Sequence, residues 1–155
     1  MDRRRFIAVA ATQSLALTPL AAALSACGRS GAWPEDMVEI KWDRDTCVRC
    51  SMVISDRRFA AQVKGGPRDE NFKFDDIGCA AFWLKDTPWA NDAHARIWVA
   101  DVHSRGDAVS WRDARRAHYV AKTSPMGYNY GAVALPEPGS LPFDDMVSHV
   151  LAKGR

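Results

Sequence analysis

A sulfur-rich segment, Cys47 to Met52, constrains this chain of 155 residues more than any other feature. It contains two thiols at Cys-x-x-Cys spacing, Cys47 and Cys50, and a thioether two residues later at Met52. Thiolates and thioethers are soft donors, which favour Cu(I), Zn or Fe–S clusters over Mg or Ca. Cu(I) accepts a thioether more readily than zinc does, so the methionine favours copper. The same cysteine spacing also fits a disulfide or a redox-active dithiol.

The N-terminus has the pattern of a secretory signal. Three arginines, Arg3-Arg4-Arg5, precede an apolar run from Phe6 to Leu24, which is the order of a basic and then an apolar signal region. The arginines followed by Phe6-Ile7 also resemble a twin-arginine export signal. Export through the general secretory route or through the twin-arginine route therefore stays open.

The signal ends in Leu24-Ser25-Ala26-Cys27, the lipobox pattern in which the cysteine is acylated. We expect residues 1–26 to be removed as a signal peptide and Cys27 to carry the lipid. Residues 27–36 would then be a lipidated tether, and residues 37–155 would form the functional domain. An ordinary signal-peptidase site near Ala26, which would leave Cys27 as a free thiol, is the alternative.

Removal of the signal changes the charge and the cysteine count of the chain. The full sequence has 21 basic and 19 acidic residues, and without residues 1–26 there are 18 of each, so we expect no nucleic-acid partner. Three thiols remain once Cys27 is acylated: Cys47, Cys50 and Cys79. A disulfide between the first two would leave Cys79 alone in an oxidising compartment, whereas a shared metal would use all three.

The apolar pattern of the domain predicts an α+β fold. Alternating or β-branched segments predict strands at residues 38–42, 52–54, 59–64, 71–74 and 96–102. Asp75 or Asp76 is expected to cap a helix, because a carboxylate accepts the free N–H groups of a first turn. The apolar stripe of that helix would be Ile77, Ala80, Ala81 and Leu84. This order gives one ββαβ-like unit.

A similar order follows in the second half of the domain. Strands are predicted at residues 108–111, 118–122 and 128–135, around a turn at Asp113-Ala114-Arg115. Phe143, Met146, Val147, Val150 and Leu151 have the spacing of an amphipathic helix. The predicted fold class is therefore α+β, a small domain of two ββαβ-like units. The second unit would be shortened, since the chain stops soon after its helix.

Several short motifs occur in a fixed order along the chain. They are the lipobox, Cys47-x-x-Cys50-x-Met52, Phe74-Asp75-Asp76-Ile77-Gly78-Cys79, Asp101, Trp111 with Asp113-Ala114, Tyr119-Val120, and Ser124-Pro125-Met126-Gly127. Together they resemble the NosL family, copper-binding lipoproteins accessory to nitrous oxide reductase. The sequence departs from the family where Ser51 replaces the usual glycine, and where Val102-His103 follows Asp101 in place of the common tyrosine.

The resemblance implies a fold of paired ββαβ units and a function in copper delivery. A protein of this family holds Cu(I) in the periplasm and passes it to the membrane machinery that assembles the copper sites of nitrous oxide reductase. The implied location is the cell envelope, with the protein anchored by the lipid on Cys27 and facing the periplasm. The choice of inner or outer membrane and the identity of the client enzyme stay open.

The candidate ligands for Cu(I) all carry sulfur: Cys47, Cys50, Met52, Met126 and Cys79. Cys50 and Met52 would share one face of a β-like segment. Met126 lies in a Pro-Met-Gly loop and not in a helical stripe, whereas Cys79 near a helix start is also explained as a small core residue.

Histidine and aspartate are the other donor types considered for the site. His103 and His118 are alternatives that could complete it. Asp75, Asp76 and Asp101 offer hard oxygen donors that suit Cu(I) poorly, and capping of the helix accounts for the first two.

A different class of function is a membrane-tethered thiol–disulfide redox protein using Cys47 and Cys50. The thioredoxin arrangement places such a motif at a helix start within a βαβ unit, whereas the segment after Cys50 has a strand-like sequence. No Ser-His-Asp arrangement and no phosphate-binding glycine loop occurs in the sequence. We therefore expect a metal carrier and not an enzyme. A structural lipoprotein with a Cys47–Cys50 disulfide is a third possibility.

Overall fold

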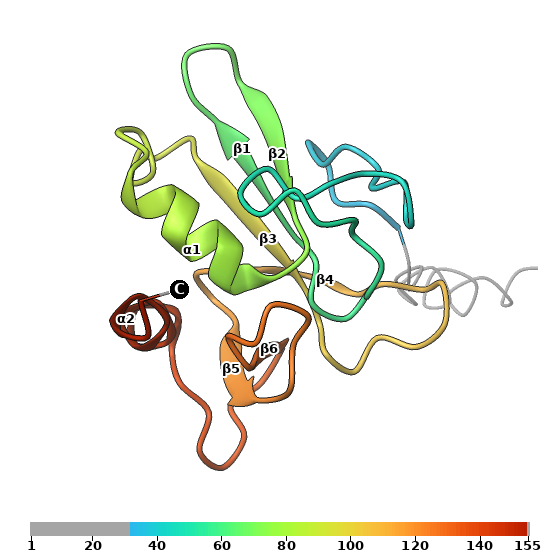
Figure 1. The fold of residues 1–155 in the computed structure, drawn as a ribbon, viewed down its shortest axis with the longest axis vertical. Coiled ribbons are helices and arrows are strands. Elements are labelled where there is room, and N and C mark those ends of the chain that lie inside the picture. The colour runs from blue at the N-terminus through green and yellow to red at the C-terminus, as the bar shows by residue number, and fades with distance from the viewer. Residues whose placement is uncertain (1–31, 155) are drawn as a thin grey trace, which may run out of the picture.

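An antiparallel sheet with a helix across one face forms the first half of the domain (Figure 1). The computed structural model describes residues 32–154, so the predicted signal peptide and the acylation site at Cys27 lie outside the described residues. The sheet has the order β2-β1-β3-β4. Its strands are β1 (Ala61–Gly65), β2 (Glu70–Phe74), β3 (Arg96–Ala100) and β4 (Trp111–Asp113), and the helix α1 is Ile77–Lys85.

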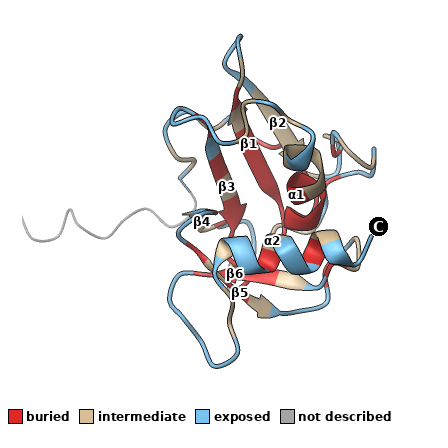
Figure 2. Ribbon diagram, turned by 90° about the vertical axis from the view of Figure 1, so that its left-hand side faces the viewer, coloured by how far each residue is buried: buried red, intermediate tan, exposed pale blue. Residues whose placement is uncertain are grey.

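Strand β1 lies at the centre of this sheet because its residues are apolar or pair their polar groups. Val63 stands opposite Phe72 of β2 on one side and Ile97 of β3 on the other. Such cross-strand apolar pairs stabilise a sheet. Figure 2 shows that the buried residues of β1, β3 and α1 lie where the helix covers the sheet.

The second half consists of a hairpin and a helix. Strand β5 (His118–Ala121) pairs antiparallel with β6 (Tyr130–Val133), and α2 (Phe143–Ala152) follows. Two residues of α2, Met146 and Val150, are buried in the same core cluster as β1 and α1. The two halves therefore share one hydrophobic core, and no strand follows α2 within residues 32–154.

The predicted α+β class is confirmed, with β1-β2-α1-β3 as the first ββαβ unit and β5-β6-α2 as a shortened second one. Two predicted strands are wrong: residues 38–42 form no strand, and residues 52–54 make only one isolated bridge, between Thr46 and Val53. The strand predicted at residues 108–111 lies later, as β4, and pairs with β3. Among the described residues, no helix is long and apolar enough to cross a membrane.

Candidate metal centre

The sulfur loop, defined here as residues 46–53, folds back on itself in a tight turn. The Cys47 N–H donates to the Met52 carbonyl at 2.8 Å, and the Ser51 N–H donates to the Cys47 carbonyl at 2.9 Å. Ser51 has a φ of 61°, in the left-handed region that glycine adopts most readily. Cys50 and Met52 therefore flank a turn, and the strand alternation expected to place them on one face is wrong.

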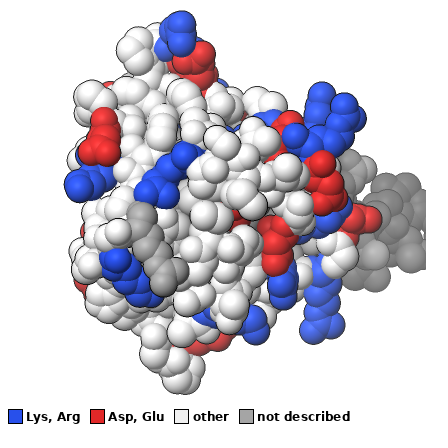
Figure 3. All heavy atoms as spheres, in the orientation of Figure 1, with Lys and Arg blue, Asp and Glu red and all other residues white. Residues whose placement is uncertain are grey.

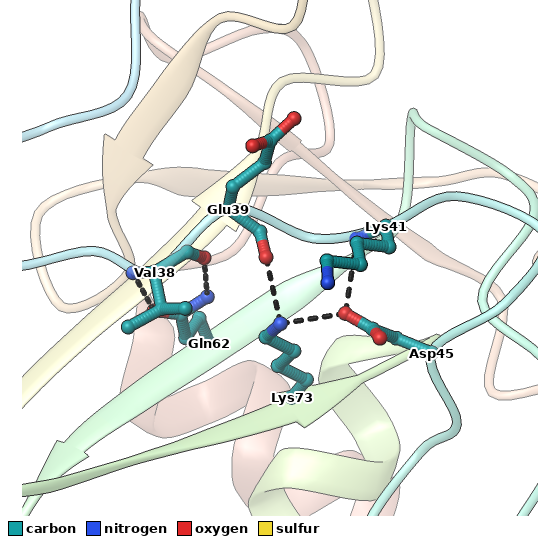
Figure 4. A network of polar contacts seen from close by, with 6 residues as sticks. All are labelled: Val38, Glu39, Lys41, Asp45, Gln62 and Lys73. Carbon is teal, nitrogen blue, oxygen red and sulfur yellow. Dashed lines mark hydrogen bonds and ion pairs between the residues drawn. The ribbon is translucent and has the colours of Figure 1, made fainter.

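Lys73 of β2 fixes the segment that leads into the sulfur loop. Lys73 Nζ donates to the Glu39 carbonyl at 2.7 Å and to Asp45 Oδ2 at 2.6 Å (Figure 4). Asp45 Oδ2 also accepts the Lys41 N–H at 2.9 Å, and the Lys73 carbonyl accepts the Val48 N–H at 2.9 Å. These bonds hold the chain on both sides of Cys47 against the sheet.

The end of β2 and the start of α1 supply the opposite side of the site. Asp76 is the N-cap of α1, and its Oδ1 accepts the Gly78 N–H at 2.8 Å. Its Oδ2 accepts the Ser124 hydroxyl at 2.5 Å and the Met126 N–H at 3.3 Å. The cap therefore also holds the Ser124–Met126 segment over the first turn of α1, next to Cys79.

Four side chains converge between the sulfur loop and the first turn of α1. The Sγ atoms of Cys47, Cys50 and Cys79 and a carboxylate oxygen of Asp75 all lie within 4.8 Å of one another. Cys47, Cys79 and Asp75 are buried, and Cys50 is half-buried. We call these four residues the donor cluster. Their spacing allows one metal ion to contact all four, since Zn–S bonds, for example, are about 2.3 Å long.

Burial and hydrogen bonding divide the thiols into one thiolate and two protonated groups. A hydrogen bond from the Cys79 thiol, supported by the backbone N–H groups of Cys50, Asp75 and Arg49, lowers the pKa of Cys47 well below its usual range. The same hydrogen bond to Cys47, followed by burial, raises the pKa of Cys79. Burial also raises the pKa of Cys50. Among the three thiols, the negative charge therefore lies mainly on Cys47.

Asp75 is the member of this cluster that the sequence argument missed. Burial, and after it the charge of Cys47, raises the pKa of Asp75 to about 6. Its Oδ1 accepts a hydrogen bond from the Cys50 thiol at 3.4 Å. The capping role expected for the Asp75-Asp76 pair belongs to Asp76. A signal was present in the sequence, because one helix start needs only one capping carboxylate, so capping could not account for both aspartates.

The other candidate ligands differ in how far they are buried and in the residues that they contact. Met52 is 56% exposed on the surface of the sulfur loop. Met126 is partly buried and packs against the core cluster that contains Cys47 and Cys79. His103 lies at the surface with its Nε2 3.1 Å from Glu137, and His118 pairs with Val133 in the hairpin. Asp101 is bound by Arg112 at 2.9 Å.

The chemistry of this arrangement suits a soft metal ion. Three sulfur donors and one carboxylate can bind a soft or borderline cation. The buried thiolate of Cys47 carries a negative charge, and no member of the donor cluster is a cationic side chain that could pair with it. Three neighbouring thiols could also form a disulfide. In the described structure Cys47, Cys50 and Cys79 are all free.

Comparison with known proteins supports the fold. No protein-family model matches the chain, and no curated protein sequence matches it either. The crystal structure of the copper chaperone NosL from Shewanella denitrificans is similar, with a TM-score of 0.53 and 16% sequence identity. The match covers 74% of this chain and 88% of that one. The chain therefore has a NosL-like fold.

Proposed function

We propose that this protein binds one Cu(I) in the donor cluster and carries it to a partner protein. The observation that supports this proposal most strongly is the convergence of Cys47, Cys50, Cys79 and Asp75 within 4.8 Å. Residues 25 to 32 positions apart in the sequence meet there, next to a helix start. The NosL-like fold is consistent with a copper carrier, because the similar structure is that of a copper chaperone.

The donor types favour Cu(I) over harder cations. Three of the four donors are sulfur atoms, and soft sulfur ligands select Cu(I) and zinc over magnesium and calcium. Asp75 is a poor ligand for Cu(I), but it accepts the hydrogen bond of the Cys50 thiol. When Cys50 binds the metal, its proton must leave, and the carboxylate is the nearest acceptor. Binding therefore releases protons from Cys50 and Cys79, and affinity rises with pH.

The exposure of the cluster fits a carrier better than a storage site. Cys50 is half-buried, and Met52 beside it is exposed. Figure 3 shows that uncharged atoms cover the middle of the face seen in Figure 1, whereas most Lys, Arg, Asp and Glu side chains lie toward its edges. A partner can approach such a surface without removing water from many charges. One sulfur atom at a time can then exchange between the two proteins.

The proposed recipient is the membrane machinery that assembles the copper sites of nitrous oxide reductase. This follows from the motif resemblance and is in keeping with the NosL-like fold. A lipid on Cys27 would hold the carrier at the membrane of the cell envelope, facing the periplasm. Confinement to the membrane raises the local concentration of the carrier beside its partner. Deletion of the protein should leave nitrous oxide reductase present but poor in copper at limiting copper supply.

The test of copper binding is a competition with a colorimetric Cu(I) chelator, using the full chain under anaerobic, reducing conditions. We expect one Cu(I) per chain and a weaker site in Cys50→Ser and Cys79→Ser. The Met37→Leu variant is a matched control, because Met37 lies outside the donor cluster. Equal copper retention by the wild type and Cys50→Ser would contradict the site.

The redox alternative predicts that the purified chain catalyses disulfide reduction, whereas the carrier proposal predicts that it does not. Its supporting observation is the lowered pKa of Cys47 beside the half-buried Cys50 thiol, as in dithiols that attack disulfides. In the structure no helix begins directly after Cys50, unlike the thioredoxin arrangement; the helix start near these thiols is that of α1, which bears Cys79. Catalytic reduction of insulin disulfides by the purified chain would support the redox protein over the carrier.

A further inference from the structure

Arg49 lies at the turn of the sulfur loop, immediately before Cys50, and contacts residues of two other segments. Its Nη1 donates a hydrogen bond of 2.8 Å to the hydroxyl oxygen of Tyr128. Its guanidinium carbon lies 4.5 Å from the centre of the Phe82 ring on α1, within the range of a cation–π contact. A single side chain thus joins the sulfur loop to α1 and to the loop before β6.

The two residues that Arg49 contacts belong to a rigid surface next to Cys79. Tyr128 is 1% exposed, and its ring centre lies 5.7 Å from that of Phe82. A Cβ atom at Gly78 would lie 2.2 Å from the Tyr128 ring, so the tyrosine packs directly on the first turn of α1. Cys79 follows Gly78 in that turn. Arg49 therefore anchors the sulfur loop beside one of the buried donors.

The two limbs of the sulfur loop are held in different ways. On the Cys47 side, backbone hydrogen bonds connect the chain to the sheet, including the bond from the Val48 N–H to the Lys73 carbonyl. On the Cys50 side, the Ser51 N–H and the Met52 carbonyl bond the backbone of Cys47 and not the sheet, and the Cys50 thiol donates to Asp75 Oδ1 at 3.4 Å. The Arg49 side chain makes the stronger contact on this limb, since hydrogen bonds of charged groups are the strong ones.

We propose that Arg49 is the positioning residue that keeps Cys50 in the donor cluster and thereby sets the rate of metal release. This proposal rests on the proposed copper-binding function. While Arg49 contacts Tyr128 and Phe82, Cys50 faces Asp75 and the two buried thiols. When these contacts break, the turn at Arg49 and Cys50 loosens while the Ser51 and Met52 backbone stays bonded to Cys47, and the metal loses the Cys50 donor to a partner. The buried donors Cys47 and Cys79 stay in place.

The first experiment needs no metal. Backbone hydrogen exchange of the full chain, with Cys27→Ser in every variant to remove the acylation site, would compare wild type with Arg49→Met. We expect faster exchange in a peptide that covers the sulfur loop, and no change in α2. Arg58→Met is the matched control, because Arg58 also lies over an aromatic ring, Phe59, at 5.4 Å but outside the loop. Unchanged exchange in the sulfur loop of Arg49→Met would overturn the proposal.

The second experiment measures release of Cu(I) to excess chelator by stopped-flow. We expect Arg49→Met to release copper about tenfold faster, since a charged hydrogen bond and a cation–π contact are lost together. Tyr128→Phe removes the hydroxyl that accepts the Arg49 hydrogen bond but keeps the ring and the Arg49–Phe82 contact, and should give a smaller acceleration; it also serves if Arg49→Met does not fold. In a Cys50→Ser background, Arg49→Met should change the rate little, because Arg49 acts through Cys50.

The outcomes separate this proposal from the proposed function. If the wild type takes up no Cu(I), the carrier function fails, and the exchange experiment still decides whether Arg49 positions the loop. If copper binds but Arg49→Met speeds its release equally with Cys50 and with Cys50→Ser, Arg49 acts elsewhere and the positioning role is overturned.

Discussion

Cys47 and Cys79 differ from Cys50 and Met52 in their access to solvent and in what holds them. The first two are at most 1% exposed and belong to the main hydrophobic core. Cys50 is half-buried and Met52 is 56% exposed, both on a loop limb near Arg49. The fold therefore fixes one pair of candidate donors and leaves the other reachable. Retention of a metal would depend on the buried pair, and transfer on the exposed pair.

The largest expected effect follows from removing the buried thiolate. Cys47→Ser should lower Cu(I) affinity by about a hundredfold, because structural Zn²⁺ sites bind with about 10–16 kcal/mol, or about 2.5–4 kcal/mol for each of four ligands. Cys47 is the sulfur donor whose pKa is lowered, so it is already a thiolate at neutral pH. Competition with a Cu(I) chelator measures the change, and Cys27→Ser is the control. If Cys47→Ser lowered the affinity for Cu(I) no more than Met52→Leu does, the buried donor would contribute no more to binding than the exposed one.

Asp75 connects the two pairs, and its burial should cost stability in the metal-free protein. Its pKa is raised from 3.8 to about 6, so folding disfavours the ionised form by about 3 kcal/mol at pH 7. Below about pH 4 the carboxyl is protonated in both folded and unfolded chains, and the cost disappears. The metal-free protein should therefore gain stability from this group as the pH falls from about 7 to about 4.

The corresponding variant is Asp75→Asn, which keeps the shape and removes the charge. Its free energy of unfolding at pH 7 should exceed that of the wild type by up to about 3 kcal/mol, with little difference near pH 4. Urea unfolding of both proteins at the two pH values would test this. Asp113→Asn is the matched control at a carboxylate outside the donor cluster. A stability gain that is the same at both pH values would show that ionisation is not the cause.

The elements of the first unit could be predicted from the sequence because local pattern and tertiary packing agree there. The alternation in β1 and β2 and the capping carboxylate before α1 correspond to the observed bonds. The strand predicted at residues 38–42 does not form, because side chains, and not a neighbouring strand, bind the backbone of this segment. Gln62 exchanges two hydrogen bonds with the Val38 backbone, and Asp45 accepts the Lys41 N–H. The alternating pattern shows which residues are apolar. It does not show which groups form hydrogen bonds with the backbone N–H and C=O groups of the segment.

The donor cluster was predictable only in part. The sequence identified Cys47, Cys50 and Cys79 as candidates, and the structure brings all three together. The rule that hard oxygen donors suit Cu(I) poorly removed Asp75 from consideration. Its place beside the thiols depends on where β2 ends relative to the sulfur loop, which no local pattern encodes. The anchoring of the loop by Arg49 on Tyr128 joins residues 79 positions apart.

A moderate effect is expected from the exposed thioether. Met52→Leu keeps the size of the side chain and removes the sulfur, and should lower Cu(I) affinity by about 1 kcal/mol, or about fivefold. The effect should be smaller than for Cys47→Ser, because a neutral thioether does not neutralise the cation. Met126→Leu provides the comparison with a partly buried methionine. X-ray absorption of the copper-loaded variants would count the sulfur neighbours, and an unchanged count in Met52→Leu would exclude Met52 from the site.

The smallest expected effect concerns the turn between the exposed donors. Ser51 has a φ of 61°, a conformation that costs a residue with a Cβ atom about 1–2 kcal/mol. Ser51→Gly removes this cost but adds about 0.5–1 kcal/mol of unfolded-chain entropy. The metal-free protein should therefore gain at most about 1.5 kcal/mol of unfolding free energy, measured by urea titration. Asp43→Gly, at another exposed position with a φ of 60°, should give a similar gain. Affinity for Cu(I) should stay unchanged, because a glycine at position 51 keeps the backbone hydrogen bond to the Cys47 carbonyl. A clear loss of affinity would show that the strained turn holds Cys50 in place together with Arg49.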